Sequence, residues 1–178
     1  MSSARPLVFG CREHEELGAA LVVARELTGQ HFALPNLWFE ANSHEVCTLR
    51  ELRRQEIAAG GRLALIRRVS RILGEGPGRV LRSQTLCPHY RICLQDHNIF
   101  QKLSLEGDLA LRDLLTCVLV HEYVHLVRFQ RLEQPYCAGP GEVREEEERV
   151  ARIARGIVTR QGCARLRDAA ARAFAEAG

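Results

Sequence analysis

The stretch from Leu111 to Leu132 carries His121, Glu122 and His125 in the order HExxH, and it constrains the fold more than any other part of the chain. Residues four apart lie one above the other on an α-helix, so the two imidazoles of a helical HExxH project from one face toward a common point. Such a pair suits two ligands of a tetrahedral Zn²⁺, and the glutamate beside them suits a general base. The motif therefore predicts a metal-binding helix here.

The residues around the motif favour a long amphipathic helix. Apolar residues recur at three- and four-residue steps, and the two histidines extend this stripe, so we expect both to point inward. Asp108 is the expected N-cap, and Pro135 with the glycines and proline that follow is expected to end the element. The alternative is a chance match whose histidines are ordinary core residues. The stripe consists of Leu111, Leu114, Leu115, Val118, His121, His125, Phe129 and Leu132.

Length and composition favour a single domain, residues 1–178, because 178 residues can bury one core and no repeat or low-complexity linker divides the chain. The net charge of +3 is modest, and the basic residues are almost all arginine, so we do not expect nucleic-acid binding. The seven cysteines are odd in number and irregularly spaced, which favours reduced thiols. No apolar run approaches the ~18 residues of a membrane span. We therefore expect a cytoplasmic protein with no membrane partner.

The N-terminal third is expected to begin with scaffold elements. Apolar periodicity predicts a helix from Leu17 to Leu27 that stops at Gly29. The short aromatic segment Leu37 to Phe39, which follows a proline, predicts a strand. Thr48 and Glu51 have the spacing of a capping box, which predicts a further helix ending at the glycine pair 60–61.

The middle of the chain is expected to contain one more helix and two strands. Residues Leu65 to Leu73 have helical periodicity, and their opposite face carries Arg62, Arg67, Arg68 and Arg71, which is most often a solvated face. Residues 80–81 and 90–94 are predicted strands separated by a turn at 87–89. Cys87, His89 and Cys93 could form a second metal site, but their spacing does not match a paired CxxC arrangement.

A catalytic zinc generally takes three protein ligands and leaves a fourth position for water, so a third ligand is needed. No histidine follows His125, and Arg128 and Arg131 stand where the metzincin pattern HExxHxxGxxH requires glycine and histidine. The remaining candidates lie in the acidic run Glu145 to Glu148, which opens a helix predicted to extend to about Thr159.

Helical periodicity chooses among these four glutamates. The apolar stripe of the second helix places Glu146 and Glu147 on the buried face and turns Glu145 and Glu148 away. We select Glu147 as the third metal ligand, because small and apolar residues follow it where two helices can approach; a neighbouring glutamate is the alternative. At least two of the four should be solvated residues of the first turn, favoured by the helix dipole. The residues that follow Glu147 on its face are Val150, Ala151, Ala154 and Ile157.

HEYVH followed by a helix that reads EERVARIA from Glu147 to Ala154 resembles the gluzincin metallopeptidases, particularly the compact ones related to the ImmA-type peptidases of phage immunity. Those proteins carry HExxH and then a glutamate helix of the form ExxAxxFA, whose last two positions Ile153 and Ala154 match. The resemblance covers roughly residues 90–158. Larger gluzincins often have an aspartate four residues after the glutamate ligand, where this chain has Ala151.

The resemblance implies a zinc metallopeptidase that acts on a peptide or protein substrate. It implies a zincin-like α+β fold, in which a small mixed sheet packs on the active-site helix and a C-terminal helix bears the glutamate. An edge strand, expected at residues 90–95, would receive an extended peptide by strand addition. His121, His125 and Glu147 would hold Zn²⁺, and Glu122 would move the proton. Tyr136 is a candidate for oxyanion stabilisation, although an ordinary packed tyrosine is the simpler interpretation.

Two other hypotheses fit parts of the same pattern. The first is another HExxH zinc hydrolase, similar to peptide deformylases, in which Cys93 supplies the third ligand from upstream; the glycine-rich and Glu-Gly-Cys motifs of that family are absent. The second is a non-catalytic module of zincin fold whose arginine-rich segment, near Arg67 and Arg68, contacts a partner.

Overall fold

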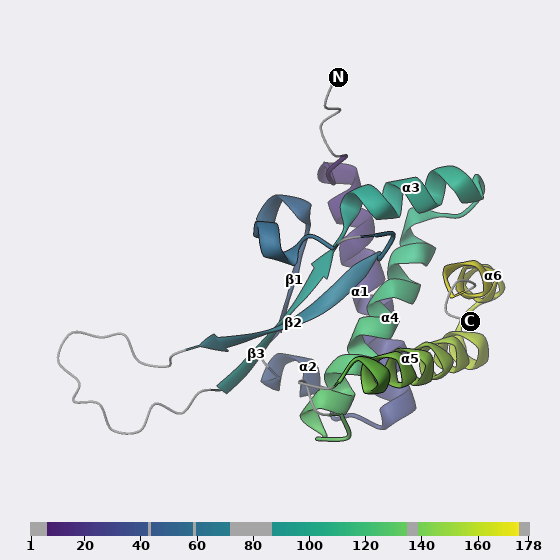
Figure 1. The fold of residues 1–178 in the computed structure, drawn as a ribbon. Helices are drawn as coiled ribbons and strands as arrows, with labels where there is room; N and C mark the ends of the chain where they lie inside the picture. The colour runs from purple at the N-terminus through teal and green to yellow at the C-terminus, as the bar shows by residue number, and fades with distance from the viewer. Residues whose placement is uncertain (1–6, 43, 59, 72–86, 135–138, 175–178) are drawn as a thin grey trace.

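The structure is a computed structural model that describes residues 7–42, 44–58, 60–71, 87–134 and 139–174. It is an α+β fold in which a three-stranded sheet lies at one side of a group of helices (Figure 1). The helices are α1 (Cys11–Phe32), α2 (Trp38–Ala41), α3 (Asp96–Glu106), α4 (Leu111–Gln130), α5 (Pro140–Gln161) and α6 (Ala164–Ala173), with the 3₁₀ turns η1 (Leu49–Glu51) and η2 (Arg54–Glu56). The strands are β1 (His44–Cys47), β2 (Ala64–Arg71) and β3 (Cys87–Leu94).

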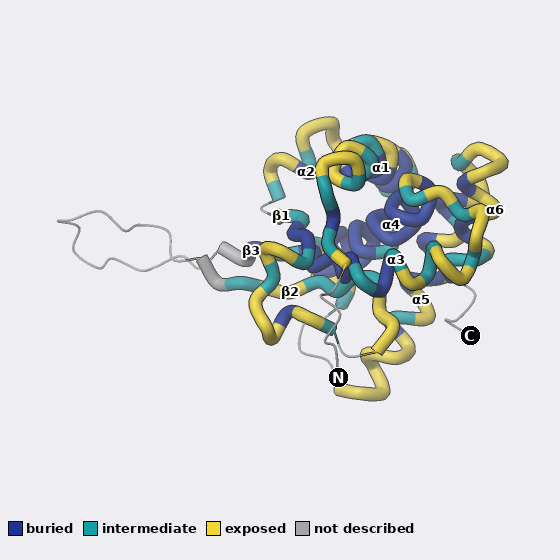
Figure 2. Tube along the Cα trace, turned by 90° about the horizontal axis from the view of Figure 1, so that it is seen from above, coloured by how far each residue is buried: buried dark blue, intermediate teal, exposed yellow. Residues whose placement is uncertain are grey.

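Helix α4 is the centre of the fold. It contacts α1, α5, α6 and β2, and the tube coloured by burial shows it as a dark core enclosed by other elements (Figure 2). Sixteen of its 20 residues are buried, five of them polar or charged, so the helix is packed on nearly every side. The prediction of a helix carrying the HExxH motif is therefore confirmed.

The predicted ends of α4 need two corrections. Its N-cap is Ala110, because the carboxylate of Asp108 pairs with Arg172 of α6 and does not cap the helix. The helix ends at Gln130, and Leu132, expected on the buried stripe, lies beyond it in the left-handed region with φ 57° and is 89% exposed. Among the described residues, none of the helices is long and apolar enough to cross a membrane.

The sheet has the strand order β1-β3-β2, with β1 parallel and β2 antiparallel to β3. Alternate residues of β3 face the core: Tyr90, Ile92 and Leu94 are buried, and the Tyr90 ring stacks on Phe129 of α4 at 5.7 Å between centroids. The predicted strand at residues 90–94 is confirmed, but it begins at Cys87, so the turn predicted at residues 87–89 is wrong. Because β3 pairs on both sides, the expectation that residues 90–95 form an edge is also wrong, and β2 is an edge strand.

The helix predicted from Leu65 to Leu73 is wrong over its described part, which is strand β2. Eight residues of β2 pair with β3, and this long-range pairing overrides an apolar pattern that also fits a helical period. Within the strand, Ile66 packs against the core cluster and Arg67 reaches the backbone carbonyl of Gln55 on the other face of the sheet. Residues 72–86, including the predicted strand at 80–81, lie outside the described residues.

Three further predictions in the N-terminal third change. Residues Leu37 to Phe39 do not form a strand, because Leu37 is the N-cap of the short helix α2. The capping box at Thr48 does form, with the Thr48 amide donating to Glu51 Oε2 at 2.8 Å, but it opens only the 3₁₀ turn η1. Helix α1 continues through Gly29 to Phe32, so glycine is tolerated inside it.

Candidate metal centre

The two histidines of the HExxH motif lie one turn apart on α4 with their ring centroids 4.9 Å apart. Both line a cavity of about 1030 Å³ between α4, α3, α5, the end of α6 and the start of β2. His125 is 4% exposed, and the side chain of His121 is 17% exposed. Both imidazoles therefore point inward, as the apolar stripe predicted, and both open onto a space that a ligand can enter.

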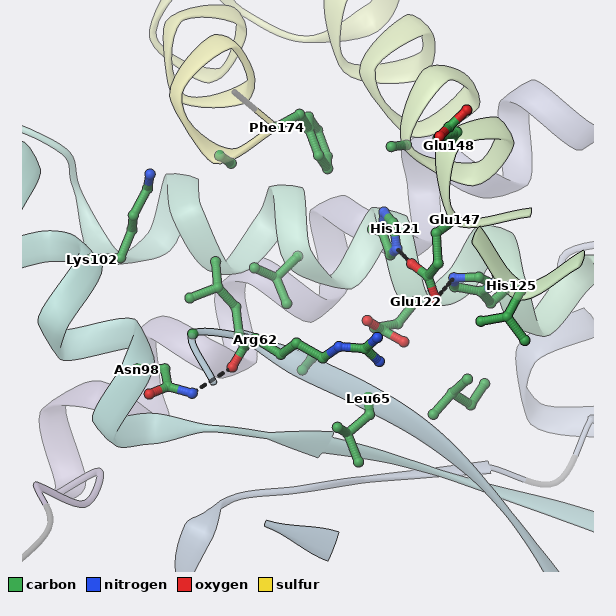
Figure 3. Close-up of a pocket in the computed structure, with 18 of the residues that line it drawn as sticks. Arg62, Leu65, Asn98, Lys102, His121, Glu122, His125, Glu147, Glu148 and Phe174 are labelled. Carbon is green, nitrogen blue, oxygen red and sulfur yellow. Dashed lines mark hydrogen bonds and ion pairs between the residues drawn. The ribbon is translucent and has the colours of Figure 1, made fainter. Parts of the chain in front are cut away.

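The carboxylate of Glu147, on α5, lies between the two imidazoles (Figure 3). Its Oε2 is 3.4 Å from Nε2 of His121, and its Oε1 is 3.5 Å from Nε2 of His125. Within the described ranges, these three residues are the one group of histidine, cysteine and acidic side chains placed to hold a metal ion, with all ligand atoms within 4.8 Å. The helical periodicity that selected Glu147 thus placed this side chain correctly.

The donor set of this group fits a zinc ion. Two imidazole nitrogens and a carboxylate oxygen are usual ligands of catalytic zinc, with metal–ligand distances of about 2.0–2.2 Å. Tetrahedral geometry at those distances puts neighbouring ligand atoms roughly 3.3–3.6 Å apart. The two N···O separations, 3.4 and 3.5 Å, fall in that range but involve different oxygens of Glu147, and the ligand atoms as a group lie within 4.8 Å of one another, so a metal ion would draw the three side chains closer together.

Electrostatics in this group favour a positive charge between the three side chains. Burial alone would raise the pKa of Glu147, but hydrogen bonds from His121 and His125 outweigh it and hold that pKa well below its usual range. Burial alone would lower the pKa of His125, but its hydrogen bond to Glu147 and the nearby charge of Glu122 raise it instead. A carboxylate this close to two imidazoles would also favour a metal cation between the three side chains.

Glu122 lies on the same face of the cavity and is 6% exposed. Burial raises its pKa, the two histidines and Arg62 lower it, Glu147 raises it, and the net direction is upward. A buried carboxylate with a raised pKa binds a proton more strongly than an ordinary surface glutamate, which suits a general base. The predicted general base is therefore buried beside the predicted metal ligands.

Glu146, the alternative third ligand, has a different role. Its carboxylate is buried and accepts hydrogen bonds from Nε and, at 3.2 Å, Nη2 of Arg128 on α4. Arg128 also donates to Glu133 at 2.7 Å. The fork of Arg128 therefore fixes α5 against α4 one residue before Glu147. Sequence reasoning missed this pair, although an arginine inside a buried apolar helix is itself a signal that a carboxylate partner lies opposite.

Residues around the ligands complete the site. The side-chain amide oxygen of Gln134 is 3.5 Å from Nδ1 of His125, which leaves Nε2 directed at Glu147. The ring of Phe174 stacks over His121 at 6.1 Å between centroids. Ala151 is 5% exposed and lines the cavity, so no carboxylate supports the ligands from that position. Neither Gln134 nor Phe174 was predicted from the sequence.

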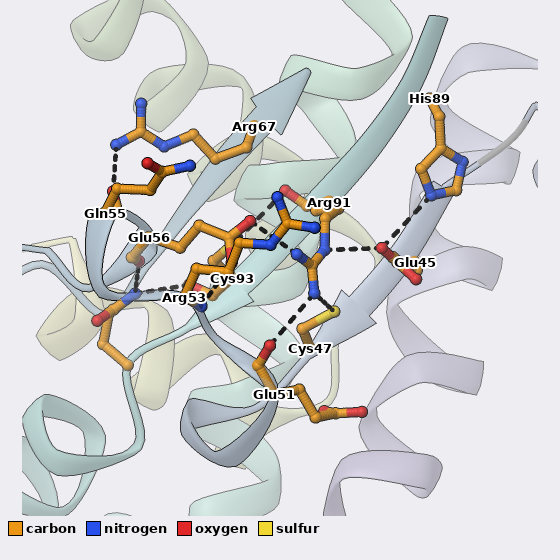
Figure 4. Close-up of polar contacts among 11 residues, drawn as sticks. Glu45, Cys47, Glu51, Arg53, Gln55, Glu56, Arg67, His89, Arg91 and Cys93 are labelled. Atoms are coloured by element: carbon orange, nitrogen blue, oxygen red, sulfur yellow. Dashed lines mark hydrogen bonds and ion pairs between the residues drawn. The ribbon is translucent and has the colours of Figure 1, made fainter. Parts of the chain in front are cut away.

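Cys47 of β1 and Cys93 of β3 lie away from this centre, in a polar cluster on the outer face of the sheet (Figure 4). Arg91 contacts Sγ of Cys47 at 3.1 Å and pairs with Glu56 at 2.7 Å, and His89 lies 3.5 Å from Glu45. Cys93 is fully buried beside them and directs its thiol to a backbone carbonyl.

This arrangement bears on the two alternative metal sites. Cys93 does not join His121 and His125, so the geometry does not support a deformylase-like ligand set. Of the second predicted site, His89 and Cys93 form no metal-binding group within the described residues, and the side chain of Cys87 lies outside them. Tyr136 also lies outside the described residues.

No protein-family model, curated protein or solved structure gives a significant match to this chain.

Proposed function

We propose that this protein is a zinc-dependent metallopeptidase of the gluzincin type and that its α+β fold is zincin-like. The observation that carries the proposal is the Glu147 carboxylate, which comes from a second helix and lies 3.4 and 3.5 Å from the two imidazoles of the HExxH motif. A buried glutamate beside two histidines and a third ligand, all facing one cavity, is the constellation that zinc-assisted peptide hydrolysis requires.

The roles of the side chains follow from their positions. His121, His125 and Glu147 would hold Zn²⁺, which supplies an acidified water and polarises the scissile carbonyl. Glu122 accepts the proton of the attacking water and donates it to the leaving nitrogen, for which its burial and raised pKa suit it. Gln134 keeps the His125 ring oriented through Nδ1, and the Arg128–Glu146 pair holds α5 where Glu147 reaches the histidines.

The position of β2 suggests how a peptide would enter. Within the described residues, strand β2 pairs with β3 along one side only, and its residues Ala64 to Ile66 line the cavity opposite the HExxH face of α4. An extended peptide that pairs with the free side of β2 would lie along this cavity. In this proposal the edge strand that receives the peptide is β2, whereas the sequence pattern predicted it at residues 90–95.

Metal content tests the ligand set. Purified protein is expected to contain about one zinc per chain by elemental analysis, and Glu147→Ala is expected to lose it. Glu145→Ala is the matched control, because Glu145 is an exposed residue of the same acidic run, and Cys93→Ala tests the upstream ligand. Zinc retained by Glu147→Ala but lost from Cys93→Ala would overturn the gluzincin assignment.

Hydrolysis tests the chemistry separately. The zinc-loaded protein is expected to cleave members of a mixed peptide library, detected by mass spectrometry, and Glu122→Gln is expected to abolish cleavage with the zinc retained. Loss of the base should reduce the rate by about 10²–10⁴-fold. A zinc-loaded protein that cleaves no peptide would leave a non-catalytic zincin-fold module as the better account.

A further inference from the structure

Arg62 lies at the start of the cavity's sheet side, two residues before β2, and its guanidinium extends across the cavity toward Glu122 (Figure 3). Within the described part of the chain, no carboxylate lies within ion-pairing distance of this guanidinium, although its charge acts on Glu122. Arg62 is an exposed residue, and its planar guanidinium fork suits bidentate binding of a carboxylate that enters the cavity.

The backbone that carries Arg62 is held in place by buried amide side chains. The Asn98 amide donates to the carbonyl oxygens of Gly60 at 3.0 Å and Arg62 at 2.7 Å, and Asn98 is 7% exposed. The side-chain oxygen of Gln95 accepts a hydrogen bond from the backbone amide of Ala58 at 3.0 Å, and the backbone amide of Gln95 donates to the carbonyl of Leu63 at 2.9 Å. The backbone from Gly60 to Leu63 is therefore preorganised, and binding of a ligand to Arg62 loses little conformational entropy in ordering it.

The other cations that line the cavity already have partners. Lys102 lies 3.3 Å from Glu106, and Arg144 lies 3.6 Å from Glu148. The two carboxylates nearest the metal centre, Glu122 and Glu147, are engaged in the proposed chemistry. Among the described residues that line the cavity, Arg62 is therefore the one cation without an ion-pair partner, and its guanidinium lies beside Glu122, the proposed general base.

We propose that Arg62 binds a carboxylate of the substrate, so that the protein acts on peptides with a negative charge close to the cleaved bond. The proposal rests on the proposed peptidase function for its meaning, but it concerns binding alone. The carboxylate has two possible sources: the side chain of an aspartate or glutamate within the peptide, or the free C-terminus of the peptide.

The test measures peptide binding to protein stripped of metal with a chelator, so neither zinc nor cleavage enters the result. The probes are fluorescein-labelled, C-terminally amidated decapeptides of alanine and threonine in which one glutamate occupies each position in turn, each with a glutamine counterpart. One further pair lacks glutamate and differs only in a free or amidated C-terminus. Fluorescence anisotropy gives the dissociation constants.

For at least one pair, the carboxylate peptide is expected to bind wild-type protein about tenfold more tightly than its neutral counterpart, which corresponds to one well-formed charge-assisted hydrogen-bonded pair. Arg62→Gln should remove this preference, and Arg62→Lys should keep only part of it because the fork is lost. Arg152→Gln, a change of an exposed arginine outside the cavity, should keep the full preference.

The identity of the responsive pair separates the two sources of the carboxylate. A response to internal glutamate assigns an acidic side chain, and a response to the free C-terminus assigns carboxypeptidase-like recognition. Equal binding of all charged and neutral peptides, absence of binding by any charged peptide, or an unchanged preference in Arg62→Gln would overturn the proposal. None of these results depends on zinc content or hydrolysis, so the peptidase proposal stands or falls separately.

Discussion

Replacing Glu146 with alanine is expected to destabilise the metal-free protein by about 3 kcal/mol, because it leaves a buried guanidinium without its main partner. Arg128 and Glu146 are 7% and 6% exposed, and the pair spans α4 and α5. Breaking a buried ion pair from one side usually costs about 3–5 kcal/mol. We take the lower end, since Arg128 keeps its contact with Glu133, whose side chain is 38% exposed and therefore solvated.

Equilibrium urea unfolding of the chelator-treated protein, followed by circular dichroism, measures this free energy. A loss of about 3 kcal/mol corresponds to a fall of roughly 6–12 °C in Tm for a chain of this size. The double variant Arg128→Met/Glu146→Leu replaces both charges by apolar side chains of similar volume, and it is expected to be within about 1 kcal/mol of wild type. Glu145→Ala, an exposed change one residue away, should alter stability by less than about 0.5 kcal/mol.

The same variants report on the metal centre. If the ion pair sets the position of α5, zinc should bind Glu146→Ala more weakly, by about 10–100-fold as for other residues that support metal ligands. Two results would refute a stabilising role of the Arg128–Glu146 pair. One is a Glu146→Ala variant as stable as Glu145→Ala, and the other is a double variant less stable than Glu146→Ala. Either result would mean that Arg128 does not depend on Glu146 in the folded protein.

Three further predictions follow from the charges and thiols. In metal-free protein, the lowered pKa of Glu147 stabilises the fold above pH 4.5, the ordinary pKa of glutamate, and this stability is lost on acidification. The raised pKa of His125 stabilises the fold below pH 6.5, the ordinary pKa of histidine, and this stability is lost as the pH rises. Urea unfolding across pH should therefore show the largest advantage of wild type over Glu147→Gln between pH 4.5 and 6.5, and a flat difference would contradict the coupling. Zinc at 100 times its dissociation constant should stabilise the protein by about 2.7 kcal/mol in thermal scans, and an unchanged Tm would contradict binding to the folded site. Iodoacetamide at pH 8 should label exposed Cys11 of the folded protein well before Cys93 and Cys117, because burial raises the pKa of those two thiols to about 12. Peptide mapping measures the labelling of each cysteine, and equal labelling of the three would refute this order.

The parts of the site that were predictable from the sequence are those set by local helical geometry. The spacing of His121 and His125 fixes their common face once the helix forms, and the apolar residues after Glu147 identify the face of α5 that meets α4. Both inferences need only the period of one helix. The same rule failed for β2, because the hydrophobic period of a short segment does not distinguish a helix from a strand that gains its hydrogen bonds from β3.

Features that depend on contacts between distant segments could not be read from the chain. The capping box at Thr48 was correct as a hydrogen bond, yet the chain leaves helical geometry at Leu52, whose φ and ψ of −78° and 139° are extended. Arg62 was expected on a solvated arginine face, whereas in the structure it lines the cavity, and its backbone carbonyl accepts a hydrogen bond from Asn98, 36 positions later.

Two consecutive glutamates of α5 have different roles: Glu146 forms a buried ion pair with Arg128, and Glu147 is the proposed metal ligand. On a helix, neighbouring residues point about 100° apart, so Glu146 can be buried against Arg128 while Glu147 faces the histidines. Arg128 lies three residues after His125, which places the ion pair directly beside the ligands along α4. The pair thereby fixes the rotation of α5 about its axis next to Glu147, where a small rotation would move that carboxylate away from the two histidines. An ion pair in this position costs desolvation, and its proposed benefit is to hold Glu147, the proposed metal ligand, beside the histidines, while Val150, Ala154 and Ile157 supply apolar packing of α5.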